Sequence, residues 1–141
     1  MSVYAESSAV LAWLLDEQSD AQIRKVLAAQ ELVIASDLTL IECDRVLLRA
    51  SFVGELSEGE GAERRAHLTE VSSHWQILRI SPEIVDRARR PFPGEPTRTL
   101  DAIHVASALV ARAAVPGLKL LSLDERVRRA GREVGLELLP T

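Results

Sequence analysis

One carboxylate stands in a segment that is otherwise small and apolar. Residues 98–107 read Arg-Thr-Leu-Asp-Ala-Ile-His-Val-Ala-Ser, and apolar residues continue through Leu109 and Val110. A stretch that is hydrophobic most of the way round is typical of a buried helix. A carboxylate at the start of such a helix must be paired, hydrogen-bonded or bound to a metal. Asp101 therefore either caps the helix, where it meets free N–H groups and the helix dipole, or belongs to a functional site.

Three other acids occupy comparable places in the chain. Glu6 follows a predicted first strand, Asp124 follows a predicted fourth strand, and Glu42 lies early in the helix after the second strand. Four carboxylates that converge on one cleft repel one another, and a divalent cation relieves that repulsion. Hard oxygen ligands favour Mg²⁺ or Mn²⁺, and Mg²⁺ recruits phosphate oxygens of a substrate. This pattern indicates phosphodiester chemistry.

Alternating strands and helices must position these acids. Short apolar or β-branched runs predict strands at 3–5, 32–35, 74–80, 118–122 and 136–139. Helices are predicted at 9–15 after a serine N-cap, 20–29, from Ser36 or Asp37 to about Phe52, 62–71, after Pro82, around Asp101, and at 124–130. The first helix is expected to end at Asp16 and Glu17, the third at Gly54 and the polar stretch 57–61, and residues 90–96 are expected to form a loop.

This order predicts an α/β fold with three layers, in which helices flank a central, mostly parallel sheet of four to five strands. Residues 1–141 are expected to form a single domain. Ligands of such folds bind at the carboxyl ends of the strands, where the four acids are predicted to lie.

Composition narrows the class of protein. The chain has 141 residues, 47% of them hydrophobic and 27% charged, which is typical of a globular protein and excludes a disordered chain. Its net charge of −4 argues against a protein whose whole surface is cationic and binds duplex nucleic acid. The single cysteine, Cys43, is expected to be a buried small residue, and it indicates a reducing, cytoplasmic environment. No apolar run has the length of a membrane span, so no membrane partner is expected.

Four motifs, taken together, resemble those of PIN-domain ribonucleases. They are Tyr-Ala-Glu-Ser-Ser-Ala at 4–9, Ile-Glu-x-x-Arg at 41–45, Thr-Leu-Asp-Ala-Ile-His-Val-Ala at 99–106, and Leu-Ser-Leu-Asp-Glu-Arg at 121–126. They occur in the order of the family and span nearly the whole chain. The chain is most similar to VapC-like toxins of type II toxin–antitoxin modules. The resemblance implies a PIN-like fold, metal-dependent cleavage of RNA, inhibition by a cognate antitoxin, and a homodimer.

The resemblance assigns roles to particular side chains. Glu6, Asp101 and Asp124 are expected to hold one or two metal ions, and Glu42 a second ion or its waters. Further contacts are expected from two hydroxyls toward the acids and two guanidiniums toward phosphate, namely Ser8, Ser122, Arg45 and Arg98. Structural alternatives remain: an intrahelical pair of Glu42 with Arg45, helix caps at Asp124 and Ser8, and salt bridges for the arginines. His104 lies one turn after Asp101 and could touch the site, but a lone histidine on an apolar helix is interpreted here as a core residue.

Glu6 departs from the family pattern, in which the first motif normally carries Asp. The additional methylene shifts the carboxylate by roughly 1.5 Å, and catalysis can depend on a displacement of that size. The rival hypothesis is therefore a PIN-fold module with weakened catalysis that binds RNA or protein. An aspartyl-phosphate receiver or phosphatase ranks last. Such a protein needs a second Asp or a Lys at the strand end that carries the phosphorylated Asp, whereas Lys119 stands at the opposite end of its strand and no Asp-x-Asp follows the first strand. For the antitoxin, an apolar groove is expected near the first three helices, with contributions from Val10, Trp13, Leu14, Leu47 and Leu48.

Overall fold

Five parallel strands form the centre of the molecule. The computed structural model describes residues 1–15 and 20–141; the expected end of the first helix at residues 16 and 17 lies outside these ranges. The strands are β1 (Ser2–Ala5), β2 (Leu32–Ser36), β3 (Gln76–Leu78), β4 (Lys119–Leu121) and β5 (Leu138–Leu139), in the spatial order β3-β2-β1-β4-β5. Every neighbouring pair is parallel, and Tyr4 of β1 lies opposite Ile34 and Leu120. The expected mostly parallel sheet is confirmed, with β1 at its centre.

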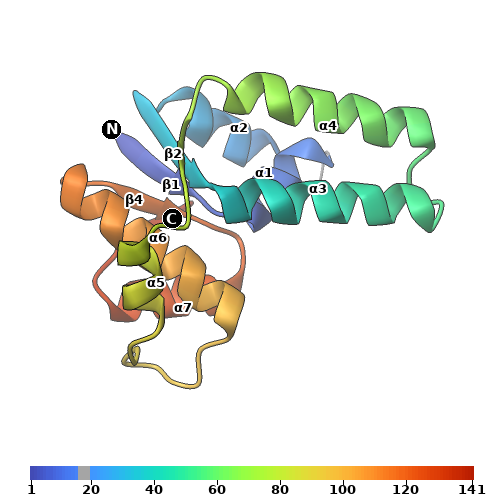
Figure 1. Cartoon of the computed structure of the whole chain (residues 1–141). Helices are drawn as coiled ribbons and strands as arrows, with labels where there is room; N and C mark the ends of the chain where they lie inside the picture. Colours follow the sequence, from blue (N-terminus) through green and yellow to red (C-terminus); the bar gives the residue numbers. More distant parts are fainter. Residues whose placement is uncertain (16–19) are drawn as a thin grey trace.

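Four helices cover one face of the sheet, on the right of Figure 1. They are α1 (Ser7–Leu14), α2 (Asp20–Ala28), α3 (Asp37–Phe52) and α4 (Glu58–Ser72). Val3 and Ala5 of β1 are fully buried against this layer, together with Ile23 and Leu47. Cys43 belongs to the same cluster and is fully buried, as expected.

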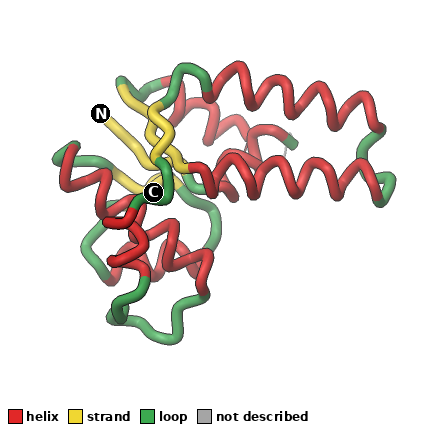
Figure 2. The backbone as a smooth tube through the Cα atoms, in the orientation of Figure 1, coloured by secondary structure: helices red, strands yellow, loops and turns green. Residues whose placement is uncertain are grey.

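Three helices cover the opposite face, below the sheet in Figure 1. They are α5 (Pro82–Ala88), α6 (Thr99–Ala114) and α7 (Glu125–Glu133). Tyr4, which alternates with Val3 and Ala5, packs here against Val105 of α6 and Val127 of α7. Figure 2 shows the irregular segment between α5 and α6 as a long loop, which confirms the loop expected at 90–96. The three-layer α/β fold is thus confirmed.

The helix boundaries differ from expectation at two places. Glu6, not a serine, is the N-cap residue of α1, and its side chain makes no capping bond because it is used elsewhere. The stretch 57–61 does not separate α3 from a later helix; α4 begins within it at Glu58, because Ser57 and Glu60 form a capping box. At the start of α3, Ser36 caps the helix through a reciprocal bond with Thr39.

The apolar residues expected to line a groove are mostly part of the core. Val10, Trp13 and Leu14 are buried in the core, so the expectation of an exposed groove is wrong at these positions, whereas Leu47, although buried, lines a cavity between α3 and α4 together with Leu48. Leu48 alone of the five is exposed, on the outer face of α3, where the Phe52 side chain is 91% exposed. No helix within the described residues is long and apolar enough to cross a membrane.

Candidate active site

All four acids singled out by the sequence line one cavity at the carboxyl edge of the sheet. Glu6 directly follows β1, Glu42 lies in the second turn of α3, Asp101 in the first turn of α6, and Asp124 immediately before α7. The cavity has a volume of about 460 Å³ and is also lined by Ser7, Ser8, Leu11, Arg98, Thr99, Leu100 and His104. We call it the acidic cavity. Parallel strands explain the convergence, because the residues that follow them emerge at the same edge.

Three serine hydroxyls hold the Glu6 carboxylate. Ser7 donates to its Oε1 at 2.9 Å, Ser122 donates to its Oε2 at 2.7 Å, and Ser8 makes a short bond to the same Oε2. The residue is 4% exposed. A buried carboxylate requires such donors, since burial without them would strongly disfavour its charge. Ser8 and Ser122 lie where the sequence placed them, whereas Ser7 was missed although it directly follows Glu6.

The Glu42 carboxylate is held by a serine and a histidine. Its Oε1 accepts a hydrogen bond from Nε2 of His104 at 2.5 Å and lies 2.9 Å from the Ser7 hydroxyl, whose one proton is shared between Glu6 and Glu42. Burial raises the pKa of Glu42, but the hydrogen bond and charge of His104 and the bond from Ser7 outweigh it, so the pKa lies below its ordinary value. Glu42 is therefore kept ionised. The alternative partner, Arg45, is exposed on α3 and does not line the acidic cavity.

His104 is buried as expected, but its ring also reaches the acids. Nδ1 lies 3.0 Å from the Tyr4 hydroxyl, and that hydroxyl lies 2.8 Å from Ser36 Oγ. Burial raises the pKa of Tyr4 to about 12, so it remains a neutral partner of the ring. Ligand atoms of Glu6, Glu42 and His104 all lie within 4.8 Å of one another. The favoured interpretation of His104 as a core residue is therefore incomplete, and the alternative that the spacing of three residues from Asp101 offered, contact with the site, is also present.

Asp101 forms an ion pair with Arg98 at the N-terminus of α6. The Arg98 Nε lies 3.0 Å from Asp101 Oδ2, with the Asp101 side chain 10% exposed and that of Arg98 57% exposed. Arg98 is the N-cap residue of α6, and no side chain of the described residues caps the helix, so the cap expected from Asp101 is absent. Its carboxylate instead faces the acidic cavity.

Asp124 has two roles at once. Its Oδ1 accepts from the backbone N–H groups of Arg126 and Val127, so the expected N-cap of the last helix is present. The Asp124 N–H is in turn held by the hydroxyls of Ser8 and Ser122, each at 3.1 Å. These serines therefore fix Asp124 to the same turn that carries Glu6.

The donor set of the acidic cavity suits a hard divalent cation. Four carboxylates line it, and Arg98 is the one guanidinium among its lining residues. Serine hydroxyls orient Glu6 without neutralising it, so like charges remain close together. Carboxylate oxygens are the ligands preferred by Mg²⁺ and Mn²⁺, whereas the proximity of His104 also admits a softer ion. The cavity could thus hold a divalent metal.

Comparison with known proteins agrees with this arrangement. The family profile of the PIN domain matches residues 3–133. No curated protein sequence matches the chain significantly. Among solved structures, the chain is similar to Mycobacterium tuberculosis VapC20, described as a toxin that cleaves the sarcin–ricin loop (TM-score 0.65, 14% identity, 92% of this chain and 95% of that one).

Two further structures come from toxin–antitoxin systems. One is a toxin–antitoxin complex from Klebsiella pneumoniae (TM-score 0.58, 19% identity, 86% of each chain). The other is VapBC2 from Rickettsia felis bound to a DNA fragment from its promoter (TM-score 0.62, 12% identity, 98% of this chain and 97% of that one). At these identities the likeness concerns the fold.

Proposed function

The chain belongs to the PIN domain family, and from that premise we propose that it is a metal-dependent endoribonuclease, the toxin of a toxin–antitoxin pair. One observation carries the proposal: Glu6, Glu42, Asp101 and Asp124 come from four separate segments and line one cavity. A purely structural role for each acid does not account for that convergence, because caps and ion pairs need no common location.

The residues of the acidic cavity divide into ligands and supports. Glu6, Asp101 and Asp124 would hold Mg²⁺ or Mn²⁺, and Glu42 would hold a second ion or its waters. When bound, such an ion supplies an activated water and stabilises charge on the phosphate. Ser8 and Ser122 would fix Glu6 and the turn before Asp124, and Arg98 would bind phosphate near Asp101. Arg45, which lines a separate surface groove, would contact RNA only at a distance from the acids.

The partners follow from the family and from the similar structures. One neighbour is described as a toxin that cleaves the sarcin–ricin loop, and others are complexes of toxin with antitoxin. We therefore propose an RNA substrate, a cognate antitoxin and a homodimer for this chain, in the cytoplasm. A partner helix with an apolar face would find exposed apolar side chains on α3, including Leu48 and Phe52.

The experiment is a cleavage assay on single-stranded RNA with Mg²⁺ or Mn²⁺. Asp101→Asn removes a charge from the acidic cavity while it keeps the side chain's size, and we expect at least a hundredfold loss of rate. Asp86→Asn makes the same change on the exposed face of α5 and should leave the rate unchanged. Cleavage that persists in excess EDTA, or in Asp101→Asn, would refute the metal-dependent mechanism.

A second candidate function rests on Glu6, which stands where the family normally has Asp. A binding module with weakened catalysis would show no turnover as the wild type and would regain it in Glu6→Asp. The two hypotheses therefore predict opposite effects of one substitution.

A further inference from the structure

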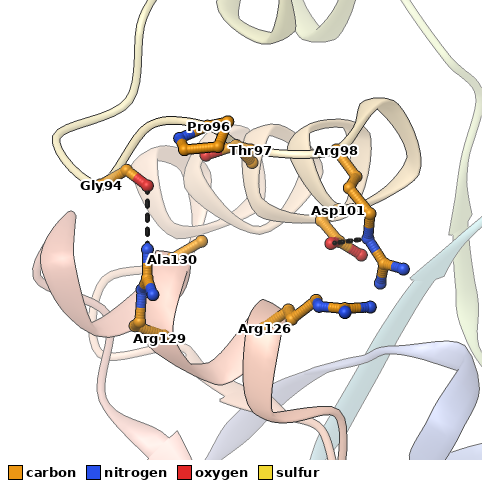
Figure 3. A pocket seen from close by; sticks show the side chains of 8 residues that line it. All are labelled: Gly94, Pro96, Thr97, Arg98, Asp101, Arg126, Arg129 and Ala130. Atoms are coloured by element: carbon orange, nitrogen blue, oxygen red, sulfur yellow. Dashed lines mark hydrogen bonds and ion pairs between the residues drawn. The ribbon is translucent and has the colours of Figure 1, made fainter.

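A second cavity lies beside the acidic cavity and is rich in arginine. It has a volume of about 400 Å³ and lies between the 94–98 segment and α7 (Figure 3). Arg98, Arg126 and Arg129 line it, together with the single acid Asp101. This arginine cavity is locally cationic although the whole chain carries a net charge of −4. It shares Arg98 and Asp101 with the acidic cavity, so the two cavities are contiguous.

Two guanidinium groups face each other at this junction. Arg98 is joined to Asp101 through Nε, and Figure 3 shows the Arg126 side chain extending toward Arg98. Within residues 1–15 and 20–141, the Arg126 guanidinium has no hydrogen bond or ion pair. Two guanidinium charges and a single carboxylate, which is paired with Arg98, favour an anion in the space that the arginines border. A guanidinium fork binds phosphate oxygens in a bidentate manner, so phosphate is the anion that fits best.

Arg129 stabilises the wall of the arginine cavity through contacts within the protein. Its Nη2 donates to the Gly94 carbonyl at 3.1 Å, and its Nε lies 3.6 Å from Glu133. The first contact ties the 94–98 segment to α7, and the second is an ion pair within α7, so Arg129 already has partners in the protein. Arg126 is therefore the side chain best placed to bind an incoming anion.

We propose that the arginine cavity is a subsite for a backbone phosphate adjacent to the scissile one, with Arg126 as its principal contact. The identity of the ligand as RNA rests on the proposed function. An RNA strand fits better than an acidic protein segment, because the subsite shares Arg98 and Asp101 with the cavity in which the cleaved phosphodiester would lie. A strand that crosses both cavities places its neighbouring phosphates in sites of opposite charge: the metal-binding acids and the arginines.

The first test measures RNA binding without metal. A short fluorescein-labelled single-stranded RNA is titrated with intact protein in EDTA, which prevents metal-dependent cleavage, over a series of salt concentrations. We expect Arg126→Gln to weaken binding about tenfold, as for the loss of a charge-assisted hydrogen bond. The slope of log K against log salt should fall by about 0.7, the value for one phosphate contact on a single strand. Arg132→Gln makes the same charge change on the exposed face of the same helix, outside the cavity, and should alter binding less than about twofold.

The second test locates the phosphate. RNAs with a neutral methylphosphonate at one linkage at a time are bound to wild type and to Arg126→Gln under the same conditions. One linkage next to the cleavage point should weaken wild-type binding about tenfold and leave binding by Arg126→Gln unchanged, because the contact is already lost.

The outcomes separate this proposal from the proposed function. If Arg126→Gln binds RNA as Arg132→Gln does, the subsite is refuted, even if the wild type cleaves RNA. The subsite is also refuted if Arg126→Gln weakens only the binding of an acidic peptide from a partner protein. If the wild type does not cleave with Mg²⁺ but Arg126→Gln loses RNA binding as expected, the subsite stands and the nuclease function fails.

Discussion

Replacement of Glu6 by Asp tests whether the serine hydroxyls around this carboxylate are placed to bind a Glu and not an Asp. The Glu6 carboxylate accepts from Ser7 at 2.9 Å and from Ser122 at 2.7 Å, and from Ser8 as well. One methylene fewer withdraws the carboxylate by roughly 1.5 Å, so these donors would lie about 4 Å away, beyond hydrogen-bonding distance. The serines that suit Glu would thus be left without their acceptor.

The expected loss can be worked from these bonds. A hydrogen bond to a charged group contributes about 1.5–3 kcal/mol, and a small backbone shift can retain one of the three. We expect Glu6→Asp to lower the free energy of unfolding by about 3 kcal/mol and Tm by about 10 °C. We also expect at least a tenfold loss of RNA cleavage, because catalysis is sensitive to a displacement of this size.

The assay combines urea unfolding with cleavage rates measured well below Tm. Glu63→Asp, on the exposed face of α4, is the matched control, and its cost should be a few tenths of a kcal/mol from helix propensity. A Glu6→Asp protein as stable as this control and more active than the wild type would refute the reasoning, and it would support the binding-module hypothesis.

Three further predictions concern pH, metal and packing. Tyr4 is the only tyrosine, so the absorbance of tyrosinate reports its ionisation directly; it should titrate near pH 12, not 10. Between these values only the unfolded chain loses the proton, so the free energy of unfolding should fall by about 3 kcal/mol as the pH rises. Mg²⁺ at a hundred times its Kd should stabilise the wild type by about 2.7 kcal/mol and so raise its Tm, and it should raise the Tm of Asp101→Asn much less. Equal Tm shifts of the two proteins in calorimetry would contradict a metal site that includes Asp101. Gly131→Ala should cost about 1–3 kcal/mol in urea unfolding, because its Cβ would lie 2.6 Å from Leu120 Cδ2; an unchanged midpoint would contradict this packing.

The sheet and most helices could be predicted because local signals agree with the tertiary structure. The β-branched run at 32–35 forms β2, and Pro82 begins α5 at its first turn. The start of α4 was not predicted, because Gly59 and Gly61 suggest a break, whereas the capping box at Ser57 starts the helix. Gly61 is needed there since a Cβ would overlap the Ser51 hydroxyl of α3, a contact that local sequence does not show.

The convergence of the acids was also predictable, since Glu6, Asp101 and Asp124 follow a strand or open a helix at one sheet edge and Glu42 lies in the second turn of such a helix. The hydrogen bonds among them were not. His104 of α6 reaches Glu42 of α3 only because these two helices, which cover opposite faces of the sheet, also contact each other. The cationic character of the arginine cavity likewise depends on two segments, the 94–98 loop and α7, whose proximity the sequence does not reveal.

The central position of β1 has a consequence for synthesis of the chain. β1 precedes β4 in the chain by more than a hundred residues, yet the two strands pair, and Asp124 follows β4. A nascent chain can gather Glu6 and Glu42 early, but it cannot add Asp101 and Asp124 until α6 and β4 have been made. Because domains generally fold as units, the growing polypeptide passes the ribosome with its acids still apart. Under the proposed function, this strand order would delay cleavage of RNA until the segments that carry all four acids have been made.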